Sequence, residues 1–343
     1  MKDSNCSMPT KTIQPDSTRK AQANNVVKSS PEAIARAVEL LQQGQLVGMP
    51  TETVYGLAGH GLNPAALARI FEVKQRPLFD PLILHFADMA GAFAMARQIP
   101  TAARVLAQRF WPGPLTLVMR KLDVVPDLAT GGLATVALRV PAHPVAQALL
   151  RAFDGPIAAP SANRFGRISP TSAQAVSVEL GLAVPLVLDG GACEVGLEST
   201  VIFLSEHKPV LLRAGGVPVE ELEALLGPIE RARAVDDQPQ APGQLKHHYA
   251  PRKPLRLVQR AAEIPARADV GWLTFGKQSL EKPFSGVVEN LSPKGQLREA
   301  AVNFFRLLRA LDDNPRVNEL YATLLPTEGL GLAINERLER AAS

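Results

Sequence analysis

The order of apolar and polar residues along the chain predicts helices and strands that alternate. Residues 30–32 have the features of a helix start, since a serine able to cap the helix precedes a proline and an acid. Apolar residues then recur at helical spacing as far as Gly44, and residues 46–49 form a short apolar run typical of a buried strand. The pattern predicts further helices from residues 63, 102, 144 and 172, and strands at 82–84, 115–119, 135–140, 157–159, 186–188, 200–204 and 210–212. This alternation favours an α/β domain with a partly parallel sheet.

Two stretches lack this periodicity and divide the chain. Residues 1–29 are polar and predict a flexible tail, whereas residues 227–254 are rich in proline, glycine and charge and predict a linker. The first domain would span residues 30–226, and a second, smaller α/β domain residues 255–343. For the second domain we expect three layers, built from strands at 255–258, 271–275 and 320–325 and helices at 297–311 and 332–341.

Composition and charge exclude several classes of protein. Apolar residues make up 46% of the chain, enough for a core in each domain, but no apolar run approaches the ~20 residues that span a bilayer. The polar N-terminus lacks the apolar centre of a secretory signal, and two cysteines cannot form a disulfide framework. We therefore expect a cytoplasmic protein without membrane contact. A formal charge of +4 decides little, and 5% aromatic residues argue against a stacking platform for single-stranded nucleic acid.

Polar groups gather where predicted strands end, which is where α/β sheets place their ligands. The segment PTETVYGL, residues 50–57, follows the first strand and offers two threonine hydroxyls and a carboxylate. These groups suit either a small polar substrate or a turn capped by hydroxyls. Ser161 and Asn163 follow a strand of small residues, which would let a ligand approach the backbone closely. His85 also ends a strand, although a lone histidine is more often structural than catalytic.

Positively charged residues occur at one predicted helix end and within one predicted strand. Lys74 and Arg76 close a predicted helix, where they either complement the helix dipole or bind a triphosphate. Arg139 lies inside an apolar strand, so it must be paired or face a ligand such as a carboxylate or phosphate. The sequence has no GxxxxGK[ST] loop, so any ATP site is not a P-loop. The adjacent His247 and His248 of the linker do not complete a tetrahedral metal set.

Taken in order, PTETVYGL, KQRP, PLILH, TVALRVP, PSANRFGRISPT and ESTV resemble the YrdC-like threonylcarbamoyl-AMP synthases over roughly residues 31–220. The linker motif APGQLKHHYAP and the C-terminal GLGLAINERL extend the resemblance to the long two-domain form of the family. The resemblance implies a YrdC-like catalytic domain with a twisted mixed α/β sheet. It also implies a smaller Rossmann-like α/β domain and a linker that crosses the active site.

The reaction that this resemblance implies joins L-threonine and bicarbonate as a carbamate, which attacks the α-phosphate of ATP. Threonylcarbamoyl-AMP and pyrophosphate are the products, Mg²⁺ is the expected companion of ATP, and a partner transferase then modifies a tRNA adenosine. The alternative from another class is a double-stranded RNA-binding module, because a basic cleft can hold RNA by shape and phosphate contacts. The second domain could also serve only as an interaction scaffold.

The resemblance also implies roles for single residues. The threonine-binding residues would be Thr53, His85, Arg139, Ala159 and Ser199, with the guanidinium of Arg139 on the threonine carboxylate. The ATP-binding residues would be Lys74, Arg76, Thr135, Ser161, Asn163, Ser169, Arg213 and, from the linker, Tyr249. Lys74 and Arg76 would act in catalysis by screening the triphosphate. Asp80 stands where the family often has asparagine, and we carry it over as an ATP-binding residue; the metal ligands stay unknown.

Overall fold

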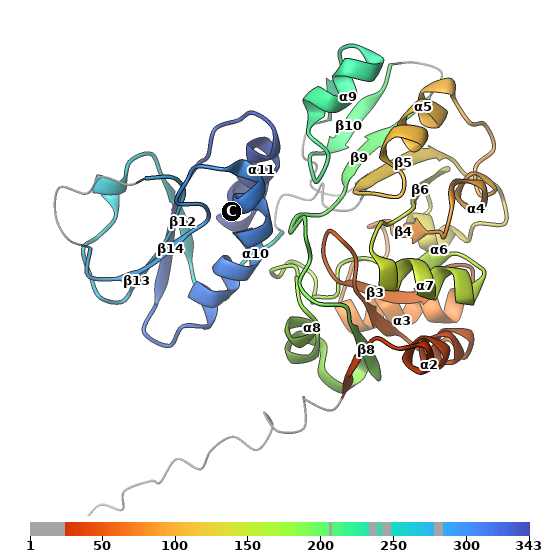
Figure 1. The fold of residues 1–343 in the computed structure, drawn as a ribbon, viewed down its shortest axis with the longest axis horizontal. Coiled ribbons are helices and arrows are strands. Elements are labelled where there is room, and N and C mark those ends of the chain that lie inside the picture. Colours follow the sequence, from red (N-terminus) through yellow and green to blue (C-terminus); the bar gives the residue numbers. More distant parts are fainter. Residues whose placement is uncertain (1–24, 206–207, 233–238, 240, 242–247, 278–283) are drawn as a thin grey trace, which may run out of the picture.

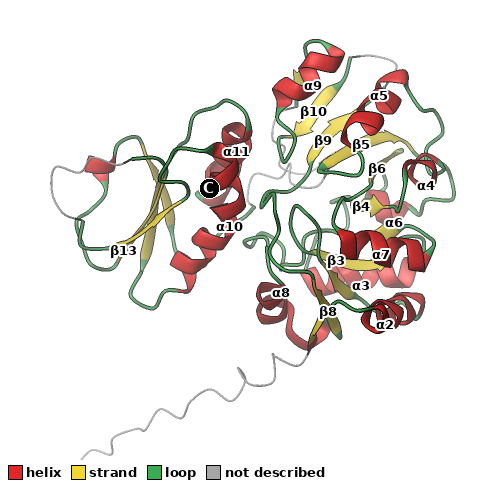
Figure 2. Ribbon diagram, viewed as in Figure 1, coloured by secondary structure: helices red, strands yellow, loops and turns green. Residues whose placement is uncertain are grey.

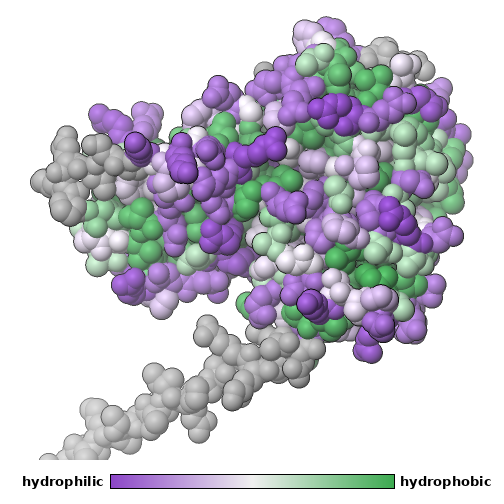
Figure 3. All heavy atoms as spheres, in the orientation of Figure 1, coloured by the Kyte–Doolittle hydropathy of each residue, from purple (hydrophilic) through white to green (hydrophobic). Residues whose placement is uncertain are grey.

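The computed structural model describes residues 25–205, 208–232, 239, 241, 248–277 and 284–343, which form two lobes (Figure 1). Within these residues each lobe is built around one sheet, and helices cover the sheets (Figure 2). No helix among the described residues is long and apolar enough to cross a membrane, and hydrophilic residues are spread over both lobes (Figure 3).

The larger lobe contains a mixed sheet of eleven strands. In spatial order these are β1 (Val26–Lys28), β8 (Leu186–Asp189), β2 (Val47–Met49), β3 (Gly56–His60), β7 (Ile157–Ala158), β4 (Ile83–His85), β6 (Thr135–Arg139), β5 (Leu115–Arg120), β9 (Thr200–Phe203), β10 (Val210–Arg213) and β11 (Glu230–Arg231). The sheet contains both parallel pairs, such as β4 with β6, and antiparallel pairs, such as β5 with β6. The expected mixed α/β sheet is therefore confirmed.

The helices of this lobe begin where the sequence provides caps. They are α2 (Pro31–Gln42), α3 (Pro64–Lys74), α4 (Met89–Phe93), α5 (Thr101–Phe110), α6 (Asp127–Thr130), α7 (Pro144–Phe153), α8 (Ala173–Leu180), the 3₁₀ turn η2 (Gly181–Ala183) and α9 (Val219–Leu226). The Ser30 hydroxyl accepts a hydrogen bond from the backbone N–H of Ala33, and Asn63 caps α3 in the same way. Both helices then have proline in their first turn, where its missing N–H costs nothing.

Three strands of the larger sheet were not among those expected. β1 lies within the predicted tail, and it pairs with β8 while the Asn25 amide donates to the carbonyls of Gly181 and Val184. β3 consists mainly of small residues, which suit its close packing, since a Cβ at Gly59 would lie 3.0 Å from the Leu46 side chain. β11 lies within the predicted linker and pairs with β10 of the first sheet.

The smaller lobe contains four strands that are all parallel. Their spatial order is β12 (Leu255–Val258), β15 (Glu319–Thr323), β13 (Val270–Thr274) and β14 (Val287–Asn290), with η3 (Ala261–Glu263), α10 (Leu297–Asp313) and α11 (Leu330–Ala341) as helices. Among the described residues, both long helices lie on the face of this sheet that is turned toward the larger lobe (Figure 1). The expectation of three full layers is therefore wrong for the described part of this lobe, since only η3 and loops belong to the other face.

The two lobes share one continuous apolar core. Phe304 and Phe305 of α10 belong to the same buried cluster as Tyr249 of the linker and Leu197 of the larger lobe. The lobes also approach each other closely at Gly196, where an added Cβ would lie 2.4 Å from the carbonyl oxygen of Ala301. Gly196 has φ +75°, a conformation that favours glycine, so close approach and backbone geometry both explain this residue.

Candidate active site

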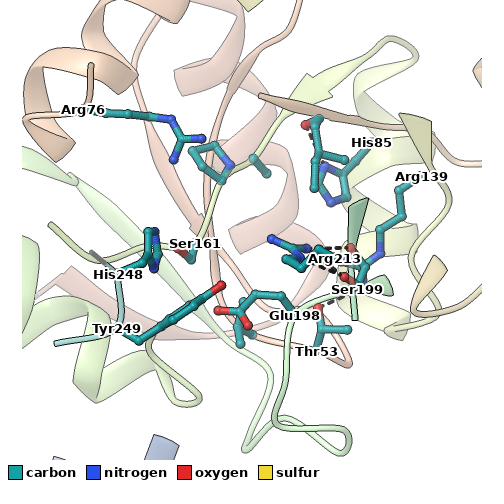
Figure 4. A pocket seen from close by; sticks show the side chains of 14 residues that line it. Thr53, Arg76, His85, Arg139, Ser161, Glu198, Ser199, Arg213, His248 and Tyr249 are labelled. Carbon is teal, nitrogen blue, oxygen red and sulfur yellow. Dashed lines mark hydrogen bonds between the residues drawn. The ribbon is translucent and has the colours of Figure 1, made fainter. Parts of the chain in front are cut away.

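A pocket of about 460 Å³ opens where the strands of the larger sheet end and the linker passes over them (Figure 4). Its lining residues are Thr53, Val54, Arg76, Ile83, His85, Arg139, Ala159, Pro160, Ser161, Glu198, Ser199, Arg213, His248 and Tyr249. Figure 4 shows two groups of side chains with Glu198 between them. We call Thr53, His85, Arg139, Ser199 and Arg213 the sheet end, and Arg76, Ser161, His248 and Tyr249 the linker end.

Arg139, at the C-terminal end of β6, is held by a buried network. Its Nη2 donates to Glu52 Oε1 at 2.7 Å and to the Thr53 hydroxyl at 2.9 Å, while its Nε donates to the carbonyl of Gly113 at 3.3 Å. The second oxygen of Glu52 accepts the backbone N–H of Ala142. Because both charges are buried and paired, the guanidinium is fixed in place, and Nη1 makes no hydrogen bond within the described residues.

The other polar groups of the sheet end are also paired. The Ser199 hydroxyl and the Thr116 hydroxyl lie 2.7 Å apart, and Arg213 donates to the carbonyl oxygen of Ser199 from both Nε and Nη2. Burial, followed by the charge of Arg139, lowers the pKa of His85 to about 3, so its imidazole is neutral at physiological pH. A neutral imidazole can hydrogen-bond a substrate without adding charge.

Lys74 lies behind the pocket wall and is not among the lining residues. Its Nζ donates to the backbone carbonyls of Ser161 at 2.5 Å and Asn163 at 2.6 Å, and burial followed by the charge of Arg76 lowers its pKa well below the usual range. These bonds use two of the three donors of a lysine ammonium, so most of its hydrogen-bonding capacity is directed to the backbone. In the described structure Lys74 therefore shapes the turn that carries Ser161.

Arg76 and Asp80 form a second buried pair in the loop after α3. Arg76 Nη2 lies 2.8 Å from Asp80 Oδ1, and the same guanidinium donates to the carbonyls of Asp80 and Pro81. Burial raises the pKa of Asp80, although Arg76 acts in the opposite direction. Neither Asp80 oxygen makes a hydrogen bond within the described residues. The arginine lines the pocket and the aspartate stands behind it.

Glu198 connects the two ends of the pocket and the smaller lobe. Its Oε1 accepts the Ser169 hydroxyl at 2.5 Å, and its Oε2 accepts Nε of Arg337 from α11 at 2.7 Å. Burial alone would raise its pKa, but the charges of Arg337 and Arg213 and the Ser169 hydrogen bond lower it to about 2. Glu198 is therefore an anion throughout the physiological range.

Tyr249 forms the linker's part of the wall in an unusual backbone conformation. Its φ is +67°, a region rarely adopted by residues other than glycine. The ring packs against His248 with centroids 4.1 Å apart and against Phe305 of α10 at 5.6 Å. The next residue, Ala250, donates its N–H to the carbonyl of Gly166, which ties the linker to the larger lobe.

Several buried polar atoms near the linker end make no hydrogen bond within the described residues. They are both carboxylate oxygens of Asp80, Asn163 Oδ1, His248 Nδ1, the Tyr249 hydroxyl and Arg337 Nη2. Such atoms are costly to bury unless a ligand or water satisfies them. No polar atom of the five residues that define the sheet end belongs to this set.

The structure brings most of the predicted site residues together. Those that line the pocket are Thr53, Arg76, His85, Arg139, Ala159, Ser161, Ser199, Arg213 and Tyr249. Lys74, Asp80 and Ser169 each contact a lining residue from behind, and Asn163 contacts Lys74. Thr135 starts the strand that Arg139 ends, so at ~3.3 Å per residue the two are roughly 13 Å apart. The sequence-based interpretation offered the Glu52 carboxylate only as a group for a substrate or a turn, and it assigned no role to Glu198 or Arg337.

One signal could have found the missed carboxylate. A buried arginine requires a counter-charge, and Glu52 is the acid within the same motif as Thr53. Arg337 gave no such signal, because it lies 139 residues from its partner Glu198 and only the packing of α11 joins them. The linker's His247 lies outside the described residues. In the described part of the chain no three His, Cys, Asp or Glu side chains gather as a metal site.

Comparison with known families accounts for both lobes. Residues 39–215 match the family Sua5_yciO_yrdC, described as "Telomere recombination", and residues 217–343 match the C-terminal domain of threonylcarbamoyl-AMP synthase. The chain belongs to the Sua5/YciO/YrdC family. Because the second match follows the first, it has the two-domain architecture, which is what the sequence motifs predicted.

Individual relatives agree with this assignment. The chain is 42% identical over 318 residues to the threonylcarbamoyl-AMP synthase of Pyrococcus abyssi, covering 89% of this chain and 93% of the relative. It is 39% identical to that of Bacillus subtilis, covering 90% and 92% of the two chains. A crystal structure of Pyrococcus abyssi Sua5 complexed with L-threonine superposes with a TM-score of 0.84 at 40% identity, covering 92% of this chain and 96% of that chain.

Proposed function

We propose that this protein is an L-threonylcarbamoyladenylate synthase, which converts L-threonine, bicarbonate and ATP into threonylcarbamoyl-AMP and pyrophosphate. The observation that carries the proposal is a pocket with a fixed, buried guanidinium at one end and, at the other, buried polar atoms without a hydrogen bond in the described structure, such as the Tyr249 hydroxyl and His248 Nδ1. The first arrangement suits a small carboxylate, and the second suits a larger polar ligand such as a nucleotide. The family and the threonine complex of a relative support the same reaction.

At the sheet end, we assign the threonine carboxylate to Arg139. Glu52 and Thr53 fix the guanidinium through Nη2, which leaves Nη1 directed to the ligand. His85 and Ser199 are the groups available for the threonine hydroxyl and amine, and Ala159 contributes backbone to the same wall. Because these groups are held before the ligand arrives, little ordering entropy is lost on binding.

At the linker end, we assign the triphosphate to Arg76 and the nucleotide to Ser161 and Tyr249, with Arg213 between the two ligands. Asn163, Ser169 and Lys74 hold the turns on which these side chains stand. Thr135 does not line the pocket, and we retain it as a proposed ATP-binding residue at the opposite end of β6 from Arg139.

The chemistry needs no covalent intermediate with the protein. An oxygen of the threonine carbamate forms a bond to the α-phosphorus of ATP, and the bond from that phosphorus to the bridging oxygen breaks, so pyrophosphate leaves with the electron pair. Both reactants are anions, so arginines that offset their charge and hold them in line lower the barrier. The linker wall at Tyr249 keeps water from the labile carbamate.

Mg²⁺ fits this pocket as an ion that enters on the triphosphate. The described residues contain no cluster of ligating side chains, and Glu198 is already bonded to Ser169 and Arg337. Magnesium usually keeps waters and binds through substrate phosphates with one or two carboxylates. Asp80 is paired with Arg76 and does not line the pocket, so we propose that the phosphates and water would hold the ion. Bound Mg²⁺ would offset phosphate charge.

The test is pyrophosphate release from purified protein. We expect release that requires L-threonine and bicarbonate together, and unchanged rates in the control Arg97→Met, which alters an exposed ion pair with Asp123. Equal release without threonine would contradict the proposal. We also expect a transferase that modifies a tRNA adenosine to consume the product. Binding of RNA to this protein without any effect on that transfer would favour the RNA-binding alternative.

A further inference from the structure

Arg337 is a charged residue of the smaller lobe that is completely buried and reaches the pocket of the larger lobe. It lies on α11 with no exposed surface, and its Nη1 donates to the carbonyls of Ala333 in its own helix and Ala214 in the larger lobe. Its Nε donates to Glu198, a pocket residue. A buried guanidinium is costly to desolvate, so these partners must hold it in one geometry.

The contact with Glu198 continues toward the predicted ATP-binding residues. Glu198 accepts the Ser169 hydroxyl through its other oxygen at 2.5 Å, so Arg337, Glu198 and Ser169 form an unbroken chain of hydrogen bonds. Glu198 has a second cation near it, Arg213, but the direct ion pair is with Arg337. Without Arg337 the carboxylate would be left buried with its Oε2 unpaired.

The same guanidinium also contacts the linker. Its Cζ lies 5.4 Å from the centroid of the Tyr249 ring, within the range of a cation–π interaction. Phe305 packs near the same ring from α10. The smaller lobe therefore supports Tyr249 from two helices, at a residue whose backbone is in the left-handed region.

We propose that Arg337 is a positioning residue for ATP, through which the C-terminal domain holds Glu198, Ser169 and Tyr249 in the geometry that binds the nucleotide. It acts on the linker end of the pocket and leaves the sheet end unchanged, because Arg139 and its partners are held within the larger lobe. This inference rests on the proposed function for the identity of the ligand. The competing explanation is that Arg337 only fastens the two lobes together.

The test compares Arg337→Met, which keeps the length of the side chain without its charge, with Arg309→Met. Arg309 is a matched control, since it also reaches from α10 to the larger lobe, donating to the carbonyl of Ile168 at 2.6 Å. We expect Arg337→Met to raise KM for ATP by about 30-fold or more, from the loss of a buried pair, with KM for threonine within about threefold. The KM for ATP of Arg337→Lys should lie between those of the parent protein and Arg337→Met, and that of Arg309→Met should stay close to the parent value. Thermal unfolding of each variant reports whether it is folded.

The pH dependence of activity distinguishes a role of Arg337 in positioning the ATP-binding residues from a role in holding the two lobes together. In the parent protein the pKa of Glu198 is about 2, so its ionisation does not affect activity in the usual range. Without Arg337 the pKa of Glu198 rises, because burial is then opposed only by the charge of Arg213 and the Ser169 hydrogen bond. As the pH falls, Arg337→Met should therefore lose activity at a higher pH than Arg309→Met. A folded Arg337→Met with the ATP KM and pH profile of Arg309→Met would overturn the inference.

Two measurements keep the test decisive. If Arg337→Met does not fold, the test uses Glu198→Gln instead. A raised KM for ATP with an unchanged KM for threonine then supports the inference, and an unchanged KM for ATP overturns it. If the parent protein shows no threonine-dependent pyrophosphate release, the proposed function fails. Calorimetric binding of ATP alone then still decides whether Arg337 positions a nucleotide: weaker binding by Arg337→Met than by Arg309→Met supports the inference, and equal binding overturns it.

Discussion

The two ends of the pocket are built in different ways. The sheet end is made by residues of the larger lobe alone, and the Arg139, Glu52, Thr116 and Ser199 side chains are paired with one another or with backbone. The linker end draws on the linker and the smaller lobe, and buried polar atoms around it have no partner in the described structure. The first is a preformed site for a small ligand, whereas the second completes its hydrogen bonds only with a ligand.

This difference has a consequence for affinity and stability. A substitution at the sheet end removes contacts that exist in the free protein, so it should affect unfolding as well as binding. At the linker end, removing an atom that has no hydrogen bond in the described structure, such as the Tyr249 hydroxyl, should affect binding more than unfolding. Arg76 is the exception at this end, because it is already paired with Asp80.

The largest expected effect is that of Arg139→Met. It removes the proposed carboxylate anchor and leaves Glu52 buried without its partner, which should destabilise the fold by roughly 3–5 kcal/mol. Threonine affinity should fall about 100-fold or more, while ATP affinity stays within a few-fold, as measured by calorimetry. The double variant Arg139→Met with Glu52→Gln is the control, because it should recover stability without recovering threonine binding. A loss of ATP binding instead would show that the two ends are not separate.

The next effect is a pH dependence of stability caused by His85. Its pKa is about 3 in the folded protein and near 6.5 when unfolded, so the unfolded chain takes up the proton first as the pH falls. The free energy of unfolding should therefore fall between pH 6.5 and about 3, by up to ~1.4 kcal/mol per pH unit. Chemical denaturation of the parent and of His85→Asn at several pH values checks this. A slope unchanged in the variant would contradict it.

The smallest expected effects come from removing single hydroxyl groups, one that is bonded to Ser199 of the sheet end and one at the linker end. Thr116→Val removes a buried bond to Ser199 and should lower the free energy of unfolding by about 1–2 kcal/mol. Tyr249→Phe removes a hydroxyl that has no partner in the described structure, so stability should be unchanged or slightly higher. Its ATP affinity should fall by about five- to tenfold if that hydroxyl bonds the nucleotide. Equal stability losses in the two variants would remove the distinction between the ends.

Local pattern singled out candidates at strand ends, among them the segment of Thr53, His85 and Arg139, because strand ends meet at one edge of a sheet. The threonine-binding role of these residues and of Ser199 came from the family resemblance, and the structure brings all four to one pocket. Pattern could not show that Lys74 turns to backbone carbonyls, since residue type does not reveal side-chain direction. Thr135 shares a face with Arg139 by the alternation of a strand but stands at its other end.

Contacts between segments far apart in the chain could not be predicted from the sequence. Arg337 meets Glu198 across 139 residues, and β3 is a strand because its small residues fit between β2 and β7. The mixed sheet and the two-domain family were predicted correctly. The placement of both long helices of the second lobe on one face of the sheet was not predicted. The face that a helical connection covers depends on the order of the strands, which the sequence does not reveal.

The left-handed backbone of Tyr249 has a kinetic consequence. A residue other than glycine in that region costs about 1–3 kcal/mol, which here is offset by packing against Phe305, His248 and Arg337. Whenever those contacts loosen, the chain recovers that energy by relaxing. An opening of the linker wall would release this strain, so the backbone of Tyr249 would favour the opening that product release requires.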